Sequence, residues 1–168
     1  MAWIEAVNIK TDLGWWHIEA VGGELTRIDL GTSPYTQAES GSLLMNTAAR
    51  QLRAYFEGSS KKFSLPLAWG GISGFRRDVL EVVAGIPFGG LLTYGEIAKL
   101  IGKPGSGQAV GAAVGTNPWL IVVPCHRVVG ADRKLHGFSA VGGLETKTWL
   151  LQHEKHEIIG GKVCLKES

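Results

Sequence analysis

The sequence of 168 residues contains only two cysteines, Cys125 and Cys164. Two cysteines cannot build the disulfide framework of a small secreted domain, and they are too few for a cysteine-rich zinc site. No apolar run is long enough to cross a bilayer, and residues 1–10 lack the basic start and apolar core of a signal peptide. We therefore expect no metal and no membrane partner, and a chain that stays inside the cell.

A strong net charge is also lacking, because 17 Lys and Arg face 15 Asp and Glu. The distribution is less even: residues 1–70 carry six basic and seven acidic side chains, and residues 71–168 carry eleven and eight. No acid occurs between Ile97 and Val128. Such a stretch can place a modest positive potential on one face, which suits a phosphate backbone, although a chance gap in a solvated surface gives the same pattern.

What is present is an ordinary globular composition, with 45% hydrophobic and 19% charged residues. A chain of this length forms one or two compact domains. The first third predicts an antiparallel meander and then a helix, followed by a connector with a domain boundary near Gly70. The predicted strands are residues 3–10, 15–21 and 25–30, and the predicted helix is residues 43–56.

The second part is predicted to be mostly helical. An apolar stripe from Phe75 to Ile86 stops at Pro87. Thr93 and Glu96 form a capping box for a short helix that Gly102 ends. After a turn, Ser106 can cap a second helix, GQAVGAAVG, which an Asn-Pro pair breaks. Two short helices across a glycine-containing turn are typical of a helix-turn-helix.

The second of these helices has almost no side-chain bulk, and Gln108 is its one long side chain. Each interior glycine lowers the stability of a helix by roughly 0.5–1 kcal/mol relative to alanine, so we expect the small residues to serve packing or binding. Close packing between helices is one explanation. Close approach to a narrow groove of DNA is the other, and the helix by itself favours neither.

The sequence VVPCHRVV, residues 122–129, places a cysteine between two apolar β-branched runs typical of a buried strand. A cysteine in such a setting is usually an inert small hydrophobe. It becomes a nucleophile when an imidazole and a positive field draw it toward the thiolate, and His126 and Arg127 can supply both. A buried structural cysteine beside a satisfied histidine remains the alternative.

The last predicted helix, LETKTWLLQHEKHE, carries Glu154 at the edge of its apolar stripe. A buried carboxylate there needs a partner. His126 is one candidate, since a glutamate that orients an imidazole next to a cysteine completes a nucleophile, base and orienting group. A surface glutamate paired with Lys155 or solvent is the other interpretation.

Four segments in this order, TYGEIAKLIG, QAVGAAVGTNP, IVVPCHRVVG and GGLETKTWLLQHE, resemble the O6-alkylguanine-DNA alkyltransferase family, the methylated-DNA–protein-cysteine methyltransferases. The resemblance covers most of Phe75 to Glu154. It implies an α+β fold, with a small N-terminal antiparallel-sheet domain of ribonuclease H-like type and a mostly helical, winged-helix-like C-terminal domain with the helix-turn-helix. The corresponding domains are residues 1–70 and 71–168.

The family resemblance implies direct-reversal DNA repair, in which an alkyl group passes irreversibly from O6-alkylguanine, or O4-alkylthymine, to Cys125 after base flipping. His126 would act as general base through a water, Glu154 would orient it, Asn117 would be a hinge, and Tyr94 would donate to N3 of guanine. The implied base pocket comprises Val128, Phe138 and Ser139. The implied DNA-binding residues are Thr93, Gln108, Ala109, Gly111 and Arg127.

Departures from the family pattern also bear on function. Gln108 stands where the family inserts an arginine into the base stack, Phe138 stands where tyrosine is common, and FSAVGGL is longer than in some members. A thioether product implies single use of Cys125 without a cofactor. The expected partner is double-stranded DNA containing O6-alkylguanine, bound by a monomer in the cytoplasm, with the chromosome or in a eukaryotic nucleus. A non-enzymatic lesion-binding protein and a helix-turn-helix regulator are the alternatives.

Overall fold

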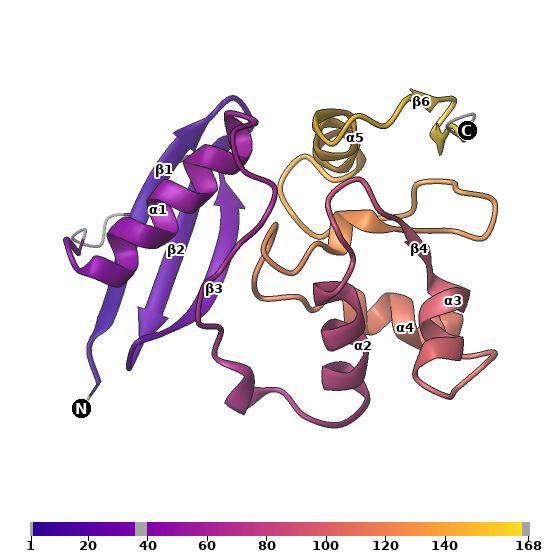
Figure 1. The fold of residues 1–168 in the computed structure, drawn as a ribbon, viewed down its shortest axis with the longest axis horizontal. Helices are drawn as coiled ribbons and strands as arrows, with labels where there is room; N and C mark the ends of the chain where they lie inside the picture. Colours follow the sequence, from indigo (N-terminus) through magenta and orange to yellow (C-terminus); the bar gives the residue numbers. More distant parts are fainter. Residues whose placement is uncertain (1, 36–39, 166–168) are drawn as a thin grey trace. The chain divides into compact units, whose positions relative to one another are not determined.

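A computed structural model describes residues 2–35 and 40–165 of the chain (Figure 1). The chain divides into two compact units, which we call unit 1 (Met1–Trp69 with Pro118–Val122) and unit 2 (Gly70–Asn117 with Val123–Ser168). A single boundary thus does not describe the chain, because a short segment of its second half belongs to the first unit. In the described part, no helix combines the length and the apolar character that a membrane span requires.

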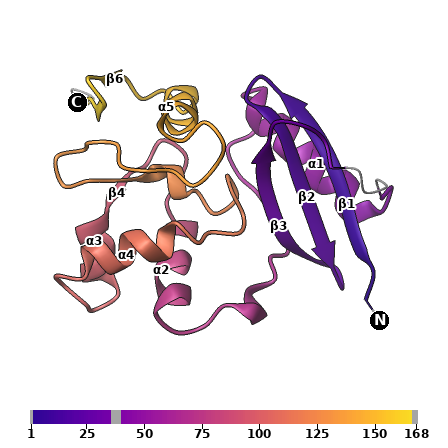
Figure 2. The ribbon, with the colours of Figure 1, turned by 180° about the vertical axis from the view of Figure 1, so that it is seen from behind.

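Unit 1 is built on a three-stranded antiparallel sheet in the order β1-β2-β3 (Figure 2). The strands are β1 (Ile4–Thr11), β2 (Gly14–Val21) and β3 (Glu24–Gly31). Gly22 and Gly23 connect the last two strands, and both have positive φ, +61° and +83°. Two residues with positive φ make a tight turn whose twist matches that of the strands. The predicted meander is confirmed.

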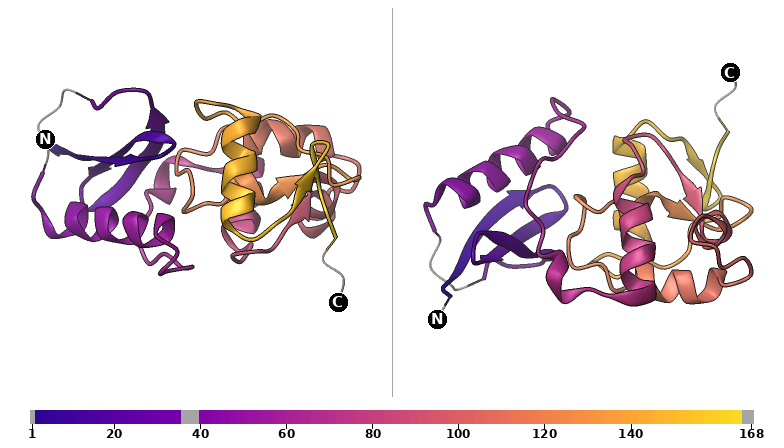
Figure 3. Two further views of the ribbon diagram at one scale, coloured as in Figure 1. Left: turned by 90° about the horizontal axis from the view of Figure 1, so that it is seen from above. Right: turned by 60° about the horizontal axis from the view of Figure 1, so that its bottom comes forward.

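The helix α1 (Leu43–Phe56) covers one face of this sheet, as Figures 2 and 3 show. Ser42 caps it by accepting a hydrogen bond from the Met45 amide. Trp16 is fully buried and its ring packs against that of Phe56, with centroids 5.2 Å apart. Aromatic and aliphatic burial of this kind is the main source of stability in a small unit.

The segment Pro118–Val122 extends the core of unit 1 from far along the sequence. The Trp119 side chain is buried, and its indole N–H donates to the Leu25 carbonyl oxygen at 2.7 Å. The Ile28 amide donates to the Pro118 carbonyl oxygen at 2.8 Å. The chain therefore leaves unit 2 after Asn117, contributes one buried indole to unit 1, and returns to form the cysteine segment.

Unit 2 is mostly helical, as expected, and confirms the predicted α+β class together with the sheet of unit 1. Its helices are α2 (Gly74–Ala84), α3 (Tyr94–Leu100), α4 (Gly107–Val114) and α5 (Leu144–His153). Its short strands are β4 (Leu92–Thr93), which pairs in parallel with β5 (Val128–Val129), and the hairpin β6 (Ile158–Ile159) with β7 (Lys162–Val163).

Local capping signals place α3 accurately. The Thr93 hydroxyl accepts from the Glu96 amide at 3.1 Å, and the Glu96 carboxylate accepts from the Thr93 amide at 2.7 Å. Gly102 follows the helix with φ of +75°, which suits glycine. Ser106 was expected to cap α4, and this was wrong: its hydroxyl donates to the Lys103 carbonyl oxygen at 2.6 Å and makes no cap bond.

Two further expectations about local structure are corrected. The segment around the cysteine is not a strand up to Pro124, because Ile121 turns the chain with φ of +73° and a 3₁₀ turn, η2 (Cys125–Arg127), follows. Only Val128–Val129 is extended and paired. The last helix ends at His153, because Lys155 has φ of +72° and the next amide bonds back to the Leu151 carbonyl oxygen.

Candidate active site

Cys125 is the first residue of the η2 turn, and its side chain is almost fully buried, with 3% of the residue exposed. It lies at a small pocket of about 30 Å³. The other residues that line this pocket are Tyr94, Gly111, Val114, Gly115, Gly137, Phe138 and Ser139. The cysteine therefore meets side chains of the helix-turn-helix on one side and the loop before α5 on the other.

A broad groove of about 800 Å³ adjoins this pocket and shares most of its lining. The N-terminal half of α4 contributes Gly107 and Gln108, and the loop after β5 contributes Gly130, Ala131 and His136. Six of the residues that line this groove are glycines. A Cβ atom built on Gly111 would lie 3.6 Å from the Tyr94 ring, which is ordinary van der Waals contact, so packing of α4 against α3 does not by itself require glycine there.

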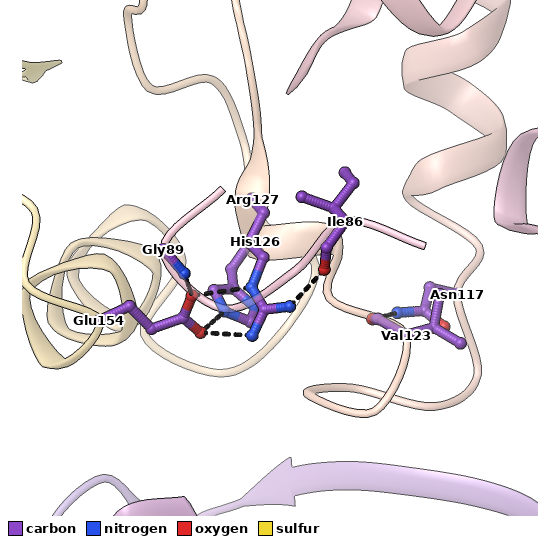
Figure 4. A network of polar contacts seen from close by, with 7 residues as sticks. All are labelled: Ile86, Gly89, Asn117, Val123, His126, Arg127 and Glu154. Carbon is purple, nitrogen blue, oxygen red and sulfur yellow. Dashed lines mark hydrogen bonds and ion pairs between the residues drawn. The ribbon is translucent and has the colours of Figure 1, made fainter. Parts of the chain in front are cut away.

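Glu154 follows α5 as its C-cap, and its carboxylate is completely buried in a network of donors (Figure 4). Its Oε2 atom lies 2.6 Å from Nε2 of His126, and its Oε1 atom accepts from Nε of Arg127 at 2.7 Å. Nη2 of Arg127 and the Gly89 amide add bonds of 2.9 and 3.2 Å. The alternative of a surface glutamate is therefore wrong.

The electrostatics of this network favour an ionised Glu154 and a neutral His126. Burial by itself raises the pKa of Glu154, but hydrogen bonds from His126 and Arg127 outweigh it and hold that pKa well below its usual range. Burial is the largest effect on His126 and lowers its pKa, against the opposing influence of Glu154. A neutral imidazole that donates from Nε2 to the carboxylate leaves Nδ1 as an acceptor.

Nδ1 of His126 is buried and has no hydrogen-bond partner within residues 2–35 and 40–165. A buried acceptor without a partner is unusual in a protein interior. It provides a place for a water or a proton donor beside the cysteine turn. The His126 ring is thereby fixed through one nitrogen and available through the other.

The thiol of Cys125 is under opposing influences. Burial raises its pKa, whereas a hydrogen bond from the Asn117 side chain and the positive charge of Lys147 act in the other direction. Asn117 also donates from Nδ2 to the Val123 carbonyl oxygen at 2.7 Å, which ties the end of the helix-turn-helix to the cysteine segment (Figure 4). The predicted role of Asn117 as a hinge stays a prediction.

Arg127 is placed differently from the sequence expectation of a DNA contact. Only 5% of it is exposed, and besides Glu154 its guanidinium donates from Nη1 to the Ile86 carbonyl oxygen at 2.6 Å (Figure 4). Its charge is therefore compensated by a carboxylate, and it is not available to a phosphate. The 3₁₀ turn explains this position. In an extended strand, successive side chains would point to opposite faces, whereas Cys125, His126 and Arg127 are all buried in the turn.

Of the remaining predicted residues, Tyr94, Gln108, Gly111, Phe138 and Ser139 line the groove, whereas Thr93, Ala109 and Val128 are not among its lining residues. Gln108 and Ala109 are exposed on α4, and Thr93 and Tyr94 are half-buried at the start of α3. Burial raises the pKa of Tyr94, and a charge on Cys125 would raise it further. Phe138 and Ser139 line both the pocket and the groove. Val128 is fully buried, and its carbonyl oxygen accepts a hydrogen bond from Lys147.

Lys147 is the one functional candidate that the sequence reading missed. Only 1% of it is exposed, and Nζ donates to the carbonyl oxygens of Val128, at 2.7 Å, and His136, at 3.3 Å. Its position could have been found, because it precedes Leu150 and Leu151 by three and four residues and so lies on the buried stripe of α5.

The residues that build this site coincide with the part of the chain that matches a known family. Residues 74–156 match the family model described as 6-O-methylguanine DNA methyltransferase, DNA binding domain. The methylated-DNA–protein-cysteine methyltransferase of Mycobacterium leprae is 39% identical over 160 residues, which are 93% of this chain and 95% of that protein.

Solved structures agree over nearly the whole chain. The O6-methylguanine methyltransferase of Mycobacterium tuberculosis is 36% identical, with a TM-score of 0.78 over 91% of this chain and 93% of that one. A structure of the M. tuberculosis protein in complex with DNA is 37% identical, with a TM-score of 0.78 over 90% and 92% of the two chains. The chain therefore belongs to the methylated-DNA–protein-cysteine methyltransferases, enzymes that repair DNA by alkyl transfer.

Proposed function

We propose that this protein acts as a monomer on duplex DNA and transfers the alkyl group of O6-alkylguanine, and of O4-alkylthymine, to Cys125. The observation that carries the proposal is the position of Cys125 at a small pocket between the helix-turn-helix and the loop of Phe138. A base inside the helical stack cannot reach a buried sulfur, so the damaged nucleotide must be flipped out, at a cost of a few kcal/mol.

The groove is the side of unit 2 that meets DNA. Thr93, Gln108, Ala109 and Gly111 lie on α3, on α4 or at their ends, and the low bulk of α4 permits close approach to a DNA groove. The flipped base then enters from this groove into the pocket. Backbone groups of Ser139 meet the base edge, and Phe138 packs against the ring, since both residues line the pocket.

The transfer itself needs a thiolate, which burial of Cys125 opposes. His126 accepts the thiol proton through a water at Nδ1, the nitrogen that Glu154 leaves available. Sγ of Cys125 attacks the alkyl carbon, the bond between that carbon and O6 breaks, and its electron pair stays on guanine. The leaving base takes up one proton, so the proton lost by the thiol balances the one gained by guanine.

Tyr94 assists the departure of the base. Its hydroxyl keeps its proton at neutral pH, since the ordinary pKa of tyrosine is about 10 and burial raises that of Tyr94 further. It can therefore donate to N3 of guanine while negative charge develops on the ring. The sulfur and the alkyl carbon end as a thioether, which cellular thiols do not reduce. Each protein molecule is thus used once, and the transfer requires no cofactor.

The test is mass spectrometry of the protein after incubation with duplex DNA that contains O6-methylguanine. We expect one methyl group on the tryptic peptide that carries Cys125. Cys125→Ala abolishes transfer but keeps DNA binding, because it removes the nucleophile and no phosphate contact. The matched control, Cys164→Ala, behaves like the wild type. Tight binding of the lesion without methylation of wild-type Cys125 would instead identify a non-enzymatic lesion-binding protein.

A further inference from the structure

Lys147 is a buried ammonium group without an acidic partner. Its residue is 1% exposed, and none of the ion pairs within the described ranges 2–35 and 40–165 includes it. Its two hydrogen bonds go to neutral carbonyl oxygens, those of Val128 and His136. Burial of an unpaired charge is costly, and here it lowers the pKa of Lys147 to about 8. An apolar side chain would fill the same space at lower cost.

The charges around Cys125 indicate a role for the buried ammonium of Lys147. Glu154 is paired with Arg127, and His126 is neutral because burial lowers its pKa, so these three residues together carry no net charge. Tyr94 keeps its proton. Neither His126 nor Arg127 therefore supplies the positive field expected from the sequence. A thiolate at Cys125 has Lys147 as the positive charge that remains uncompensated around it.

The hydrogen bonds of Lys147 also join the two walls of the pocket. Val128 follows Cys125 by three residues, and His136 directly precedes the loop residues Gly137, Phe138 and Ser139 that line the pocket. One amine on α5 thus holds both segments by their carbonyl groups. An ammonium has three donors, and the two carbonyls use two of them. One donor is left over by these two bonds.

We propose that Lys147 is a positioning residue that serves as counter-ion of the Cys125 thiolate while it fixes the two segments that form the pocket. This rests on the proposed transfer to Cys125. The role requires a charged amine, and a neutral donor at the same place cannot replace it. Arg127, by contrast, is paired with Glu154, so its charge is compensated and does not serve as counter-ion of the thiolate.

Three substitutions separate charge from hydrogen bonding: Lys147→Arg keeps both, Lys147→Gln keeps a donor without the charge, and Lys147→Met keeps neither. The probe is iodoacetamide, which reacts with thiolates, and its rate at Cys125 is measured against pH in the full-length Cys164→Ser protein. We expect Gln and Met to raise the midpoint of the profile by at least about one pH unit, which is about a tenfold lower rate at neutral pH.

Lys147→Arg is expected to keep the midpoint close to that of the wild type, and Lys155→Met, which removes an exposed lysine of the same unit, is the matched control. A wild-type midpoint in Lys147→Gln, or an equal shift in all three variants, would overturn the proposal. If Lys147→Met does not fold, as judged by circular dichroism, the comparison of Gln with Arg decides alone.

The iodoacetamide assay uses no DNA and no alkylated base. Its outcome is therefore independent of whether the wild type takes a methyl group from DNA. A shifted midpoint without methyl transfer would leave Lys147 as counter-ion and refute the proposed substrate. Methyl transfer with an unshifted midpoint would leave the proposed function and refute the role of Lys147.

Discussion

The two units of this protein bury different kinds of side chain. In the described part of unit 1, His17 is the one polar or charged side chain that is buried, and the rest of the core consists of residues such as Trp16 and Leu52. Unit 2 buries the charged groups Arg127, Lys147 and Glu154. The first unit is stabilised by apolar burial, whereas the second also contains desolvated charges.

This difference determines how each unit responds to substitution. An apolar core loses stability in proportion to the volume removed. A buried ion pair contributes little net stability when intact, yet removal of one partner is strongly destabilising because the other charge remains buried. The same change in unit 2 therefore affects folding and chemistry together, and substitutions in the two units can separate the two effects.

The largest effect is expected from Glu154→Gln compared with Leu52→Ala. Glu154→Gln leaves the Arg127 guanidinium buried without a counter-charge, which costs roughly 3–5 kcal/mol of unfolding free energy, and it also slows alkyl transfer. Leu52→Ala costs roughly 2–5 kcal/mol through the cavity it leaves in unit 1. The rate at which the Leu52→Ala protein takes the methyl group from free O6-methylguanine is expected to stay at the wild-type value.

Urea denaturation gives the two stabilities, and mass spectrometry of Cys125 gives the rates under conditions in which circular dichroism shows a folded protein. A Leu52→Ala protein that is folded but slow with the free base would contradict the separation of the two units. So would a Glu154→Gln protein with normal stability.

The second prediction concerns His126 and Glu154 as one functional pair. Nε2 of His126 lies 2.6 Å from Oε2 of Glu154, and in the proposed relay Glu154 acts on the sulfur only through the imidazole. We expect His126→Ala and Glu154→Gln each to slow transfer strongly with little loss of DNA affinity, and the double variant to be hardly slower than the slower single variant. If the rate loss of the double variant, expressed as free energy, equals the sum of the two single losses, His126 and Glu154 do not act as one unit.

Local signals in the sequence predict much of the fold. The capping box of Thr93 and Glu96 and the helix at 43–56 depend on neighbours a few residues apart, and the structure confirms both. Ser106 shows the limit of such signals, because its backbone, with φ of −93° and ψ of 23°, is not in the extended conformation from which a hydroxyl accepts from the helix amides.

Contacts between distant residues could not be derived in the same way. The Arg127 guanidinium finds its partners 27 and 41 positions away, at Glu154 and Ile86, and only the 3₁₀ turn at Cys125 directs it there. The burial of Lys147 similarly depends on carbonyls of two other segments. The family motif identified the candidate residues, whereas the distribution of charge among them required the three-dimensional structure.

The third prediction is a loss of stability in acid, in two steps. The folded-state pKa of His126 lies below 6.5, so below that pH the unfolded chain binds a proton that the folded chain does not, and stability falls. The folded-state pKa of Glu154 lies below 4.5, which gives a further loss below that pH. Urea midpoints at a series of pH values measure both steps.

Substitutions assign these steps to the two units. His17 in unit 1 also has a pKa lowered by burial, so His17→Gln reduces only the first step. Glu154→Gln removes the second. A wild-type protein whose stability is constant from neutral pH to below pH 4.5 would contradict the charge states given to both units.

The smallest effect is expected at Gln108, the exposed residue of α4 that lines the groove of unit 2. An arginine there adds a charge for phosphates and a planar group that can stack in the gap left by a flipped base. Gln108→Arg is expected to bind duplex DNA more tightly, with a salt slope steeper by about one unit. Repair of duplex lesions accelerates more than reaction with free O6-methylguanine, because only the duplex reaction includes flipping.

Gln108→Lys adds the charge without the planar group and is the matched control, which should steepen the salt slope with less gain in repair. If Gln108→Arg accelerates both substrates equally, or neither, Gln108 does not occupy the gap and another residue of α4 must fill it.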